Sequence, residues 1–257
     1  MSWWTDHAES LTFASALVGL AIDEGSQASS EVLLLSLLQF AGAPREEAEA
    51  SHLARLIDAL FTQGRLQPVT GVGPQHYRID LIMGHSLAAR PVVAAMFCVL
   101  ARQRGLDAHL IHSATLPLIL LNLEHGQCLC DTSAGTATVW SAEEWLRIRE
   151  KKASRPMDPL ELELAFREVT PTELIAELSS QLYDHAVAAG DLTSALRHAI
   201  RRAELLPNSA DALLERGRLY AQLGMRAEAA EDFGDFLLRW PGSSHAQAVS
   251  LQLSMML

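Results

Sequence analysis

The chain has 257 residues, of which 49% are hydrophobic and 20% charged, so a packed core in one large or two small domains is expected rather than disorder. Its net charge of −11 argues against a nucleic-acid-binding surface, which needs clustered cations. The sequence has no secretory leader, no apolar run of about 20 residues and only three cysteines, which predicts a cytoplasmic protein without a membrane partner or a disulfide framework.

Residues 7–64 have the apolar spacing of helices. In the third predicted helix, apolar residues recur at steps of three and four from His52 to Phe61, and Gly64 is placed to end it. The second predicted helix, residues 31–40, is apolar on nearly every side and is therefore expected to be buried. Residues 66–80 are rich in proline and glycine, including Gly71, and predict a loop or a short hairpin.

The next stretch predicts one buried helix packed on a small antiparallel sheet. Residues 91–101 are apolar throughout, with Pro91 at the helix start and Gly105 at its end. Four β-like runs follow, over residues 108–112, 118–123, 127–130 and 136–139. This order of elements predicts an α+β core. Ser141 and Glu144 have the spacing of a capping box that starts another helix.

A group of cations follows that helix start. Its members are Arg147, Arg149, Lys151, Lys152 and Arg155. They predict either the solvated end of a helix or a patch for a phosphate or an acidic partner. The segment Arg155-Pro-Met-Asp-Pro159 predicts a linker. Thr170, Pro171 and Glu173 then predict the start of another helix.

From Gly190 to Pro241 the sequence repeats at a spacing of 34 residues. The matching pairs are Gly190 and Gly224, Ala195 and Ala229, and Pro207 and Pro241. Large apolar positions of the second unit are filled by Tyr220, Phe233 and Phe236. This period and these residue types are typical of tetratricopeptide helical hairpins, in which the alanines allow close helix packing and the prolines end the second helix. Residues 245–257 predict a helix that caps the array.

Several of these segments resemble a bacterial family of transglutaminase-like proteins with C-terminal tetratricopeptide repeats, the SirB type. The resemblance runs from about Leu81 to the end of the chain. It rests on Leu100-Ala-Arg-Gln-Arg-Gly-Leu, on Cys130-Asp-Thr-Ser-Ala-Gly135 and on the repeats. It implies a core similar to papain or transglutaminase, in which a Cys at the start of the central helix, a His on the following strand and an Asp on the next form a catalytic triad.

Two members of that triad are missing from the matching positions. The helix start around Arg90 and Pro91 has no Cys, and the position of the His falls near residues 114–117, which contain no His. Asp131 is the one match. Because the thiolate is the nucleophile and the His activates it, the resemblance implies a core without catalysis, a pseudoenzyme.

Other residues were weighed as replacements. Cys98 lies two turns inside the apolar helix, where a thiol is inert. His125, Cys128, Cys130 and Asp131 could form a metal site, although structural zinc sites use a wider Cys spacing. We therefore expect no metal and no cofactor.

Three histidines and one helix start also lie near the predicted core. His109 and His112 are three apart on a predicted strand and so face opposite sides. His85 precedes the buried helix, and the backbone N–H groups at the start of that helix near Arg90 could hold an anion, as most helix starts can.

The organisation that follows has three parts. Residues 1–80 form the helical N-terminal part of the transglutaminase-like domain, residues 81–155 its degenerate core, and residues 171–257 the repeats with their capping helix. Within residues 156–257 there are 15 acids and 8 bases, which favours a basic partner.

The preferred function is a non-catalytic adaptor whose repeats bind a protein or peptide. The first helix of each pair lines the binding face in the tetratricopeptide pattern, which predicts contacts from Asp211, Leu214, Arg218 and Gln222. In the preceding unit the same register selects Asp184, with Ser180 and Val187 beside it. The alternative is a cysteine-type amidase, peptidase or acyltransferase whose nucleophile is one of the three cysteines.

Overall fold

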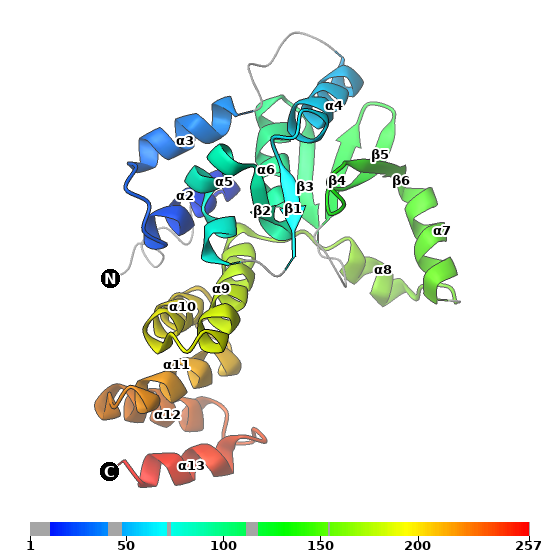
Figure 1. Ribbon diagram of the computed structural model, residues 1–257. Coiled ribbons are helices and arrows are strands. Elements are labelled where there is room, and N and C mark those ends of the chain that lie inside the picture. The colour runs from blue at the N-terminus through cyan, green and yellow to red at the C-terminus, as the bar shows by residue number, and fades with distance from the viewer. Residues whose placement is uncertain (1–10, 41–47, 71–72, 112–117, 154, 257) are drawn as a thin grey trace. The chain divides into compact units, whose positions relative to one another are not determined.

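The computed structural model describes residues 11–40, 48–70, 73–111, 118–153 and 155–256 (Figure 1). The chain divides into two compact units, of which the first contains residues 11–174 and the second residues 175–256. Both sheets belong to the first unit and the second is helical, so the fold is a mixture of helix and sheet, as predicted. Within the ranges described, none of the helices is long and apolar enough to cross a bilayer.

The first unit begins with helices, as the apolar spacing predicts. They are α2 (Phe13–Asp23), α3 (Ser30–Gln39), α4 (Glu49–Ile57) and a wider π turn over Asp58–Thr62. Ser29 caps α3 because its hydroxyl accepts the N–H of Val32 at 3.3 Å. Gly64 ends the π turn with a φ of 68°, a conformation that favours glycine.

The prediction that the helix over residues 31–40 is buried is wrong, because α3 lies at the surface. Leu33 and Leu37 are buried, but Val32 and Leu35 are 54% and 50% exposed. The helix contacts α2, α5 and α6 along its buried side only. Its composition is apolar all round, yet its neighbours cover one side.

Helix α6 (Arg90–Gln103) is the centre of this unit, and its buried segment runs without a break from Val92 to Ala101. It contacts α2, α3 and α4 as well as strands of both sheets, which accounts for burial on all sides. Gly105 follows it with a φ of 80°, as expected for the residue that ends a helix.

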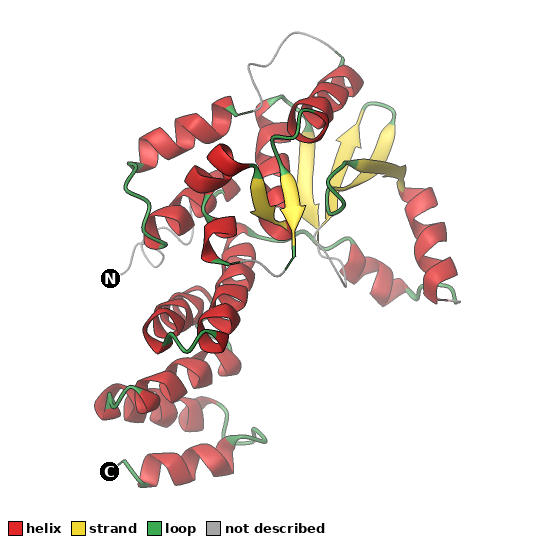
Figure 2. Cartoon of the chain, in the orientation of Figure 1, coloured by secondary structure: helices red, strands yellow, loops and turns green. Residues whose placement is uncertain are grey.

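The larger sheet has four antiparallel strands in the order of the chain (Figure 2). They are β3 (Asp107–Ile111), β4 (Leu118–Leu123), β5 (Gly126–Asp131) and β6 (Thr138–Ser141). In the register, Ala108 lies opposite Leu121, Leu121 opposite Cys128, and Cys128 opposite Ser141. The four predicted strands agree with these bounds to within two residues, except that His112 lies outside the described residues.

Residues 66–80, predicted as a loop or a short hairpin, do not form a hairpin. Strand β1 (Gln67–Val69) pairs in parallel with β2 (Leu87–Ala89), which follows much later in the chain. Between them lie a 3-10 turn (Pro74–Tyr77) and helix α5 (Ile79–His85). Gly71 lies outside the described residues. The prolines and glycines mark breaks correctly, but the strand partner comes from beyond the segment.

The predicted capping box at Ser141 is confirmed. Its hydroxyl accepts the N–H of Glu144 at 3.2 Å, and the Glu144 carboxylate accepts the N–H of Ser141 at 3.0 Å. Helix α7 (Ala142–Ala153) starts there. The same reciprocal pair, now between Thr170 and Glu173, starts α9.

The predicted linker from Arg155 to Pro159 is irregular up to Asp158, but the segment that follows it is structured. It contains helix α8 (Pro159–Ala165), and the N–H of Val169 then donates to the carbonyl of Leu110 at 2.7 Å, against the edge of β3. Phe166 packs edge-on to Trp145 with ring centroids 5.5 Å apart. This segment therefore belongs to the core of the first unit.

The second unit consists of two helical hairpins and a final helix. The helices are α9 (Pro171–Ala188), α10 (Leu192–Leu205), α11 (Ala210–Gln222), α12 (Arg226–Arg239) and α13 (Ala246–Ser254), and the boundary between the units falls within α9. The backbone repeats at 34 residues together with the sequence. Gly190 and Gly224 have φ values of 73° and 77°. The N–H groups of Leu206 and Trp240 donate to the carbonyls of Arg202 and Phe236 at 2.9 and 2.8 Å.

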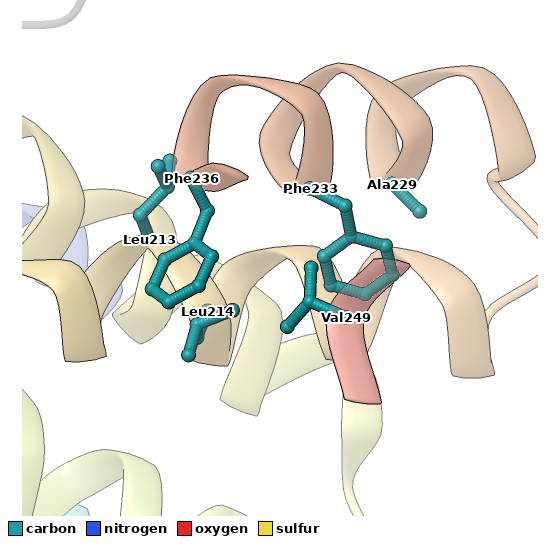
Figure 3. Packing of buried hydrophobic residues seen from close by; sticks show 6 residues of the cluster. All are labelled: Leu213, Leu214, Ala229, Phe233, Phe236 and Val249. Atoms are coloured by element: carbon teal, nitrogen blue, oxygen red, sulfur yellow. The ribbon is translucent and has the colours of Figure 1, made fainter. Parts of the chain in front are cut away.

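The core of the second hairpin joins three helices. Figure 3 shows the rings of Phe233 and Phe236 pointing from α12 toward Leu214 of α11 and Val249 of α13. The remaining buried members are Leu213 and Ala229. Helix α13 thus covers apolar surface that α11 and α12 would otherwise expose.

Gly217 allows α11 and α12 to approach closely. A Cβ added there would lie 2.8 Å from the Phe233 ring and 3.1 Å from the Asp232 Cβ. Gly217→Ala is therefore expected to destabilise the second unit by about 1–3 kcal/mol, the usual cost of overpacking, despite the better helix propensity of alanine.

Gly234→Ala is the matched control for this prediction. Gly234 lies in the facing helix α12 with no atom within 4 Å of an added Cβ. The Gly234→Ala variant should have a free energy of unfolding higher by up to about 1 kcal/mol, because alanine has the better helix propensity. Urea denaturation of both variants, followed by circular dichroism, measures the difference. Equal changes in the two would show that the helices do not pack as described.

Candidate functional site

Cys98 has no catalytic environment. It is fully buried in α6, and its thiol donates to the Ala108 carbonyl at 3.4 Å. Burial raises the pKa of the Cys98 thiol to about 11, so the thiolate is scarcely populated at neutral pH. This environment agrees with the prediction of an inert core thiol.

The two cysteines of β5 lie in a sheet strand. Cys130 is fully buried, and burial raises the pKa of its thiol. Cys128 is half-buried. In the described part of the chain, no three His, Cys, Asp or Glu side chains come together as a possible metal site, and this includes His125, Cys128, Cys130 and Asp131.

Asp131, which the predicted resemblance matched to a catalytic Asp, begins a turn. Its carboxylate accepts the N–H of Ser133 at 2.8 Å where β5 ends. An aspartate that bonds the backbone two residues on is a common way to begin a turn. Residues 114–117, where the family places its His, lie outside the described residues.

The start of α6 contains Ala89 as its extended cap, followed by Arg90 and Pro91. His85 is exposed at the end of α5. No thiol belongs to this helix start, because the cysteine of α6 lies two turns further along. The described residues of the core therefore offer no nucleophile where the family has one.

In the second unit, the charges of two predicted contact residues, Asp184 and Arg218, act on Tyr183 of α9. Burial is the main reason why the pKa of Tyr183 is raised. The negative charges of Asp184 and Glu215 raise it further, whereas Arg218 and Arg202 oppose the shift. Asp184 and Arg218 are both exposed. This cluster of α9, α10 and α11 side chains is the candidate site of the second unit.

Tyr183 and Glu215 are not among the residues predicted from the sequence. Glu215 of α11 forms an ion pair with Arg202 of α10. Tyr183 is half-buried and packs against a cluster formed by Ala186, Ala195, Ala199 and Leu219. A signal was present, because Tyr183 precedes Gly217 by one period of 34, so a large side chain stands in the first hairpin where the second has none.

The remaining predicted contacts have different positions. Asp211 and Gln222 are exposed at opposite ends of α11, about 16 Å apart along the helix axis. Val187 is exposed and Ser180 half-buried. Leu214 corrects the prediction, because it is only 2% exposed and packs in the core against α12. It has no surface to offer a partner.

The cations from Arg147 to Arg155 mostly have local partners. The Arg155 guanidinium donates to both carboxylate oxygens of Glu161, at 2.5 and 2.7 Å, and this lowers the pKa of Glu161 to about 2. Arg147 lies 3.6 Å from Glu143, and Arg149 lies 5.7 Å from the Trp145 ring centre. Such contacts are typical of a solvated helix end.

No protein-family model and no curated protein matches the chain. Among solved structures, it is similar to menin, whose crystal structure is titled as revealing the binding site for Mixed Lineage Leukemia (MLL) protein. The TM-score is 0.44 and the sequence identity 10%, over 95% of this chain and 66% of the menin chain. The chain thus spans less than two-thirds of that protein, and a similarity at this level does not establish a shared fold.

Proposed function

We propose that this protein is a non-catalytic adaptor: a transglutaminase-like pseudoenzyme of the SirB type whose tetratricopeptide repeats bind a protein partner with a basic segment. The observation that carries the proposal is the period of 34, which the residues share with the backbone. Left-handed glycines and helix-ending hydrogen bonds recur at the same interval as the alanines and prolines. Repeats of this kind commonly bind other proteins along a face of successive helices.

The exposed charges of the second unit support the character of the partner. Asp184 and Asp211 lie on α9 and α11, the first helices of the two hairpins, and Arg218 is the exposed cation of α11. With more acids than bases in this half of the chain, a basic segment is attracted and an acidic one repelled.

The thiols support the absence of catalysis. Cys98 and Cys130 are buried with raised pKa values, the opposite of what a nucleophilic cysteine requires. An electrophilic amide probe at neutral pH should therefore leave both unlabelled in the folded protein. Labelling of either one, with loss of a measurable hydrolysis on its replacement by alanine, would support the cysteine enzyme instead.

Charge reversal on the repeat face tests the adaptor. Affinity capture from the native cell should recover a partner, and Asp184→Arg should weaken its binding about tenfold or more, whereas Arg218→Glu, which adds negative charge to the face, should not weaken the binding of a basic segment. Purified partner and protein are then compared by isothermal titration calorimetry.

Glu231→Arg is the matched control. Glu231 is exposed on α12, the second helix of its hairpin, so this variant changes the net charge as Asp184→Arg does without altering the proposed face. Its affinity should equal that of the unaltered chain. A partner that binds all these variants equally, or no partner at all, would refute the assignment of this face.

A further inference from the structure

The surface helix α3 exposes three large apolar side chains. Val32 is 54% exposed, Leu35 50% and Leu34 36%. Single exposed leucines are ordinary on protein surfaces, but several neighbouring ones on one helix mark an interaction site.

A groove of about 700 Å³ lies beside these residues, within the first unit. Its apolar walls include Val32, Leu33 and Phe40 on the α3 side and Met83 on α5. The volume is within the range of binding sites, and most of the lining side chains come from two helices that contact each other.

The direction of the apolar surface indicates the shape of an occupant. At about 100° per residue, Val32, Ser36 and Gln39 share the face of α3 that borders the groove. Leu35 lies about 60° around the helix from Val32, on the side away from the buried Leu33. The apolar strip therefore extends along the outside of α3 beyond the groove. An elongated segment fits this strip better than a compact small molecule does.

One carboxylate and one guanidinium line the groove, those of Asp80 and Arg65. Asp80 is balanced, because its carboxylate accepts hydrogen bonds from Arg78 at 3.2 and 2.7 Å and from Ser26 at 2.9 Å. Arg65 donates to the Phe40 carbonyl at 2.6 Å, and within the described ranges it has no ion-pair partner. In a chain with a net charge of −11, this guanidinium is a local exception that favours an acid.

The wall at the end of α5 is held rigidly. Ser86 has a φ of 65°, the one positive value among the described non-glycine residues. Its N–H donates to the Ile82 carbonyl and its carbonyl accepts the N–H of Gln67, both at 2.7 Å. These two hydrogen bonds stabilise the left-handed backbone of Ser86 at this end of the groove.

We propose that the groove between α3 and α5 docks an acidic amphipathic helix of a partner protein. Apolar side chains of that helix fill the space between Val32 and Met83 and cover Leu35, while one of its carboxylates pairs with Arg65. The ten residues of α3 span about 15 Å, which matches the two to three turns that such helices use in grooves. This site lies in the first unit and is separate from the repeat face.

Selection from a displayed library of random 16-residue peptides, with the full chain as bait, tests the proposal. Enriched peptides should carry apolar residues at helical spacing together with Asp or Glu. Synthetic, fluorescently labelled copies should bind the chain by anisotropy. We expect Leu35→Ser and Arg65→Glu each to weaken that binding about tenfold, and peptides with Lys in place of their acids to recover affinity for Arg65→Glu.

The controls are chosen from the same unit. Leu160→Ser changes a leucine of α8 that is 63% exposed, and Arg147→Glu reverses the charge of an exposed arginine on α7. Both should bind the peptides unchanged, as should Arg218→Glu on the repeats. If no enriched peptide depends on Leu35, the docking site is refuted. If peptides depend on Leu35 but ignore the charge at position 65, the acidic partner is refuted. The exchange of charges between peptide and protein separates a lost contact from a misfolded variant.

Discussion

Replacing Phe233 by alanine is expected to lower the free energy of unfolding of the second unit by about 3–5 kcal/mol, the range for removal of a buried aromatic side chain. The ring is 0% exposed. It lies between α11 and α13, where Leu214 and Val249 contact the same core (Figure 3). Removal of the Phe233 ring therefore both removes apolar contacts and leaves a cavity.

The cavity cannot close easily. Gly217 already brings the α11 backbone against this ring, so the helix has little room to move closer along its length. In a repeat array each element is stabilised mainly by its neighbours. Because Phe233 connects α12 to both α11 and α13, its removal also weakens the attachment of the final helix.

Leu238→Ala is the control for Phe233→Ala. Leu238 lies in the same helix and is 80% exposed, so its truncation should change the stability by less than about 0.5 kcal/mol. Urea unfolding followed by circular dichroism gives the free energies of unfolding. Hydrogen exchange with mass spectrometry shows which residues lose protection. Faster exchange should be confined to residues 175–256. A similar loss in both variants would contradict the assigned core.

Asp232→Ala is expected to lower the free energy of unfolding of the second unit by about 2–3 kcal/mol. This is somewhat less than the 3–5 kcal/mol typical of breaking a fully buried ion pair. Asp232 is 4% exposed in α12, and its carboxylate accepts hydrogen bonds from Arg216 of α11 at 2.9 and 2.5 Å. This bonding is the main reason why the pKa of Arg216 is raised. Arg216 is 24% exposed, so water partly compensates for the lost partner.

Asp235→Ala provides the comparison, because Asp235 is exposed in the same helix and lies 3.4 Å from Arg239. A surface pair of this kind is worth less than about 1 kcal/mol. The double variant Arg216→Ala/Asp232→Ala should lose less than the sum of its single variants, since neither charge is then left alone. Additive losses would show that the two side chains do not interact in solution.

Much of the first unit could be predicted from local patterns. The apolar run after Pro91 predicted α6, and the capping pair at Ser141 predicted the start of α7. These signals are local, because caps and turns involve residues within one helical turn. The partner of β1 was missed because it is Leu87–Ala89, separated from β1 by a turn and a helix.

The candidate site of the second unit was predicted only in part. The register of 34 placed Asp184 and Arg218 on exposed surfaces, but it assigned Leu214 to the same face. A helical period states which residues share a side of the helix. How far the next helix covers that side depends on the size of side chains such as Phe236, which belong to another element.

By itself, the sequence determined the 34-residue repeat, the central apolar helix and most strand positions, because periodicity and turn residues act over short stretches of chain. The tertiary structure alone decided that α3 is exposed, that residues 166–169 return to the edge of β3 and that Tyr183 gathers charges from α9, α10 and α11. The physical reason is the same in all three cases. Burial, strand pairing and electrostatic neighbourhood depend on residues that are distant in sequence, and no local pattern specifies which of them will meet.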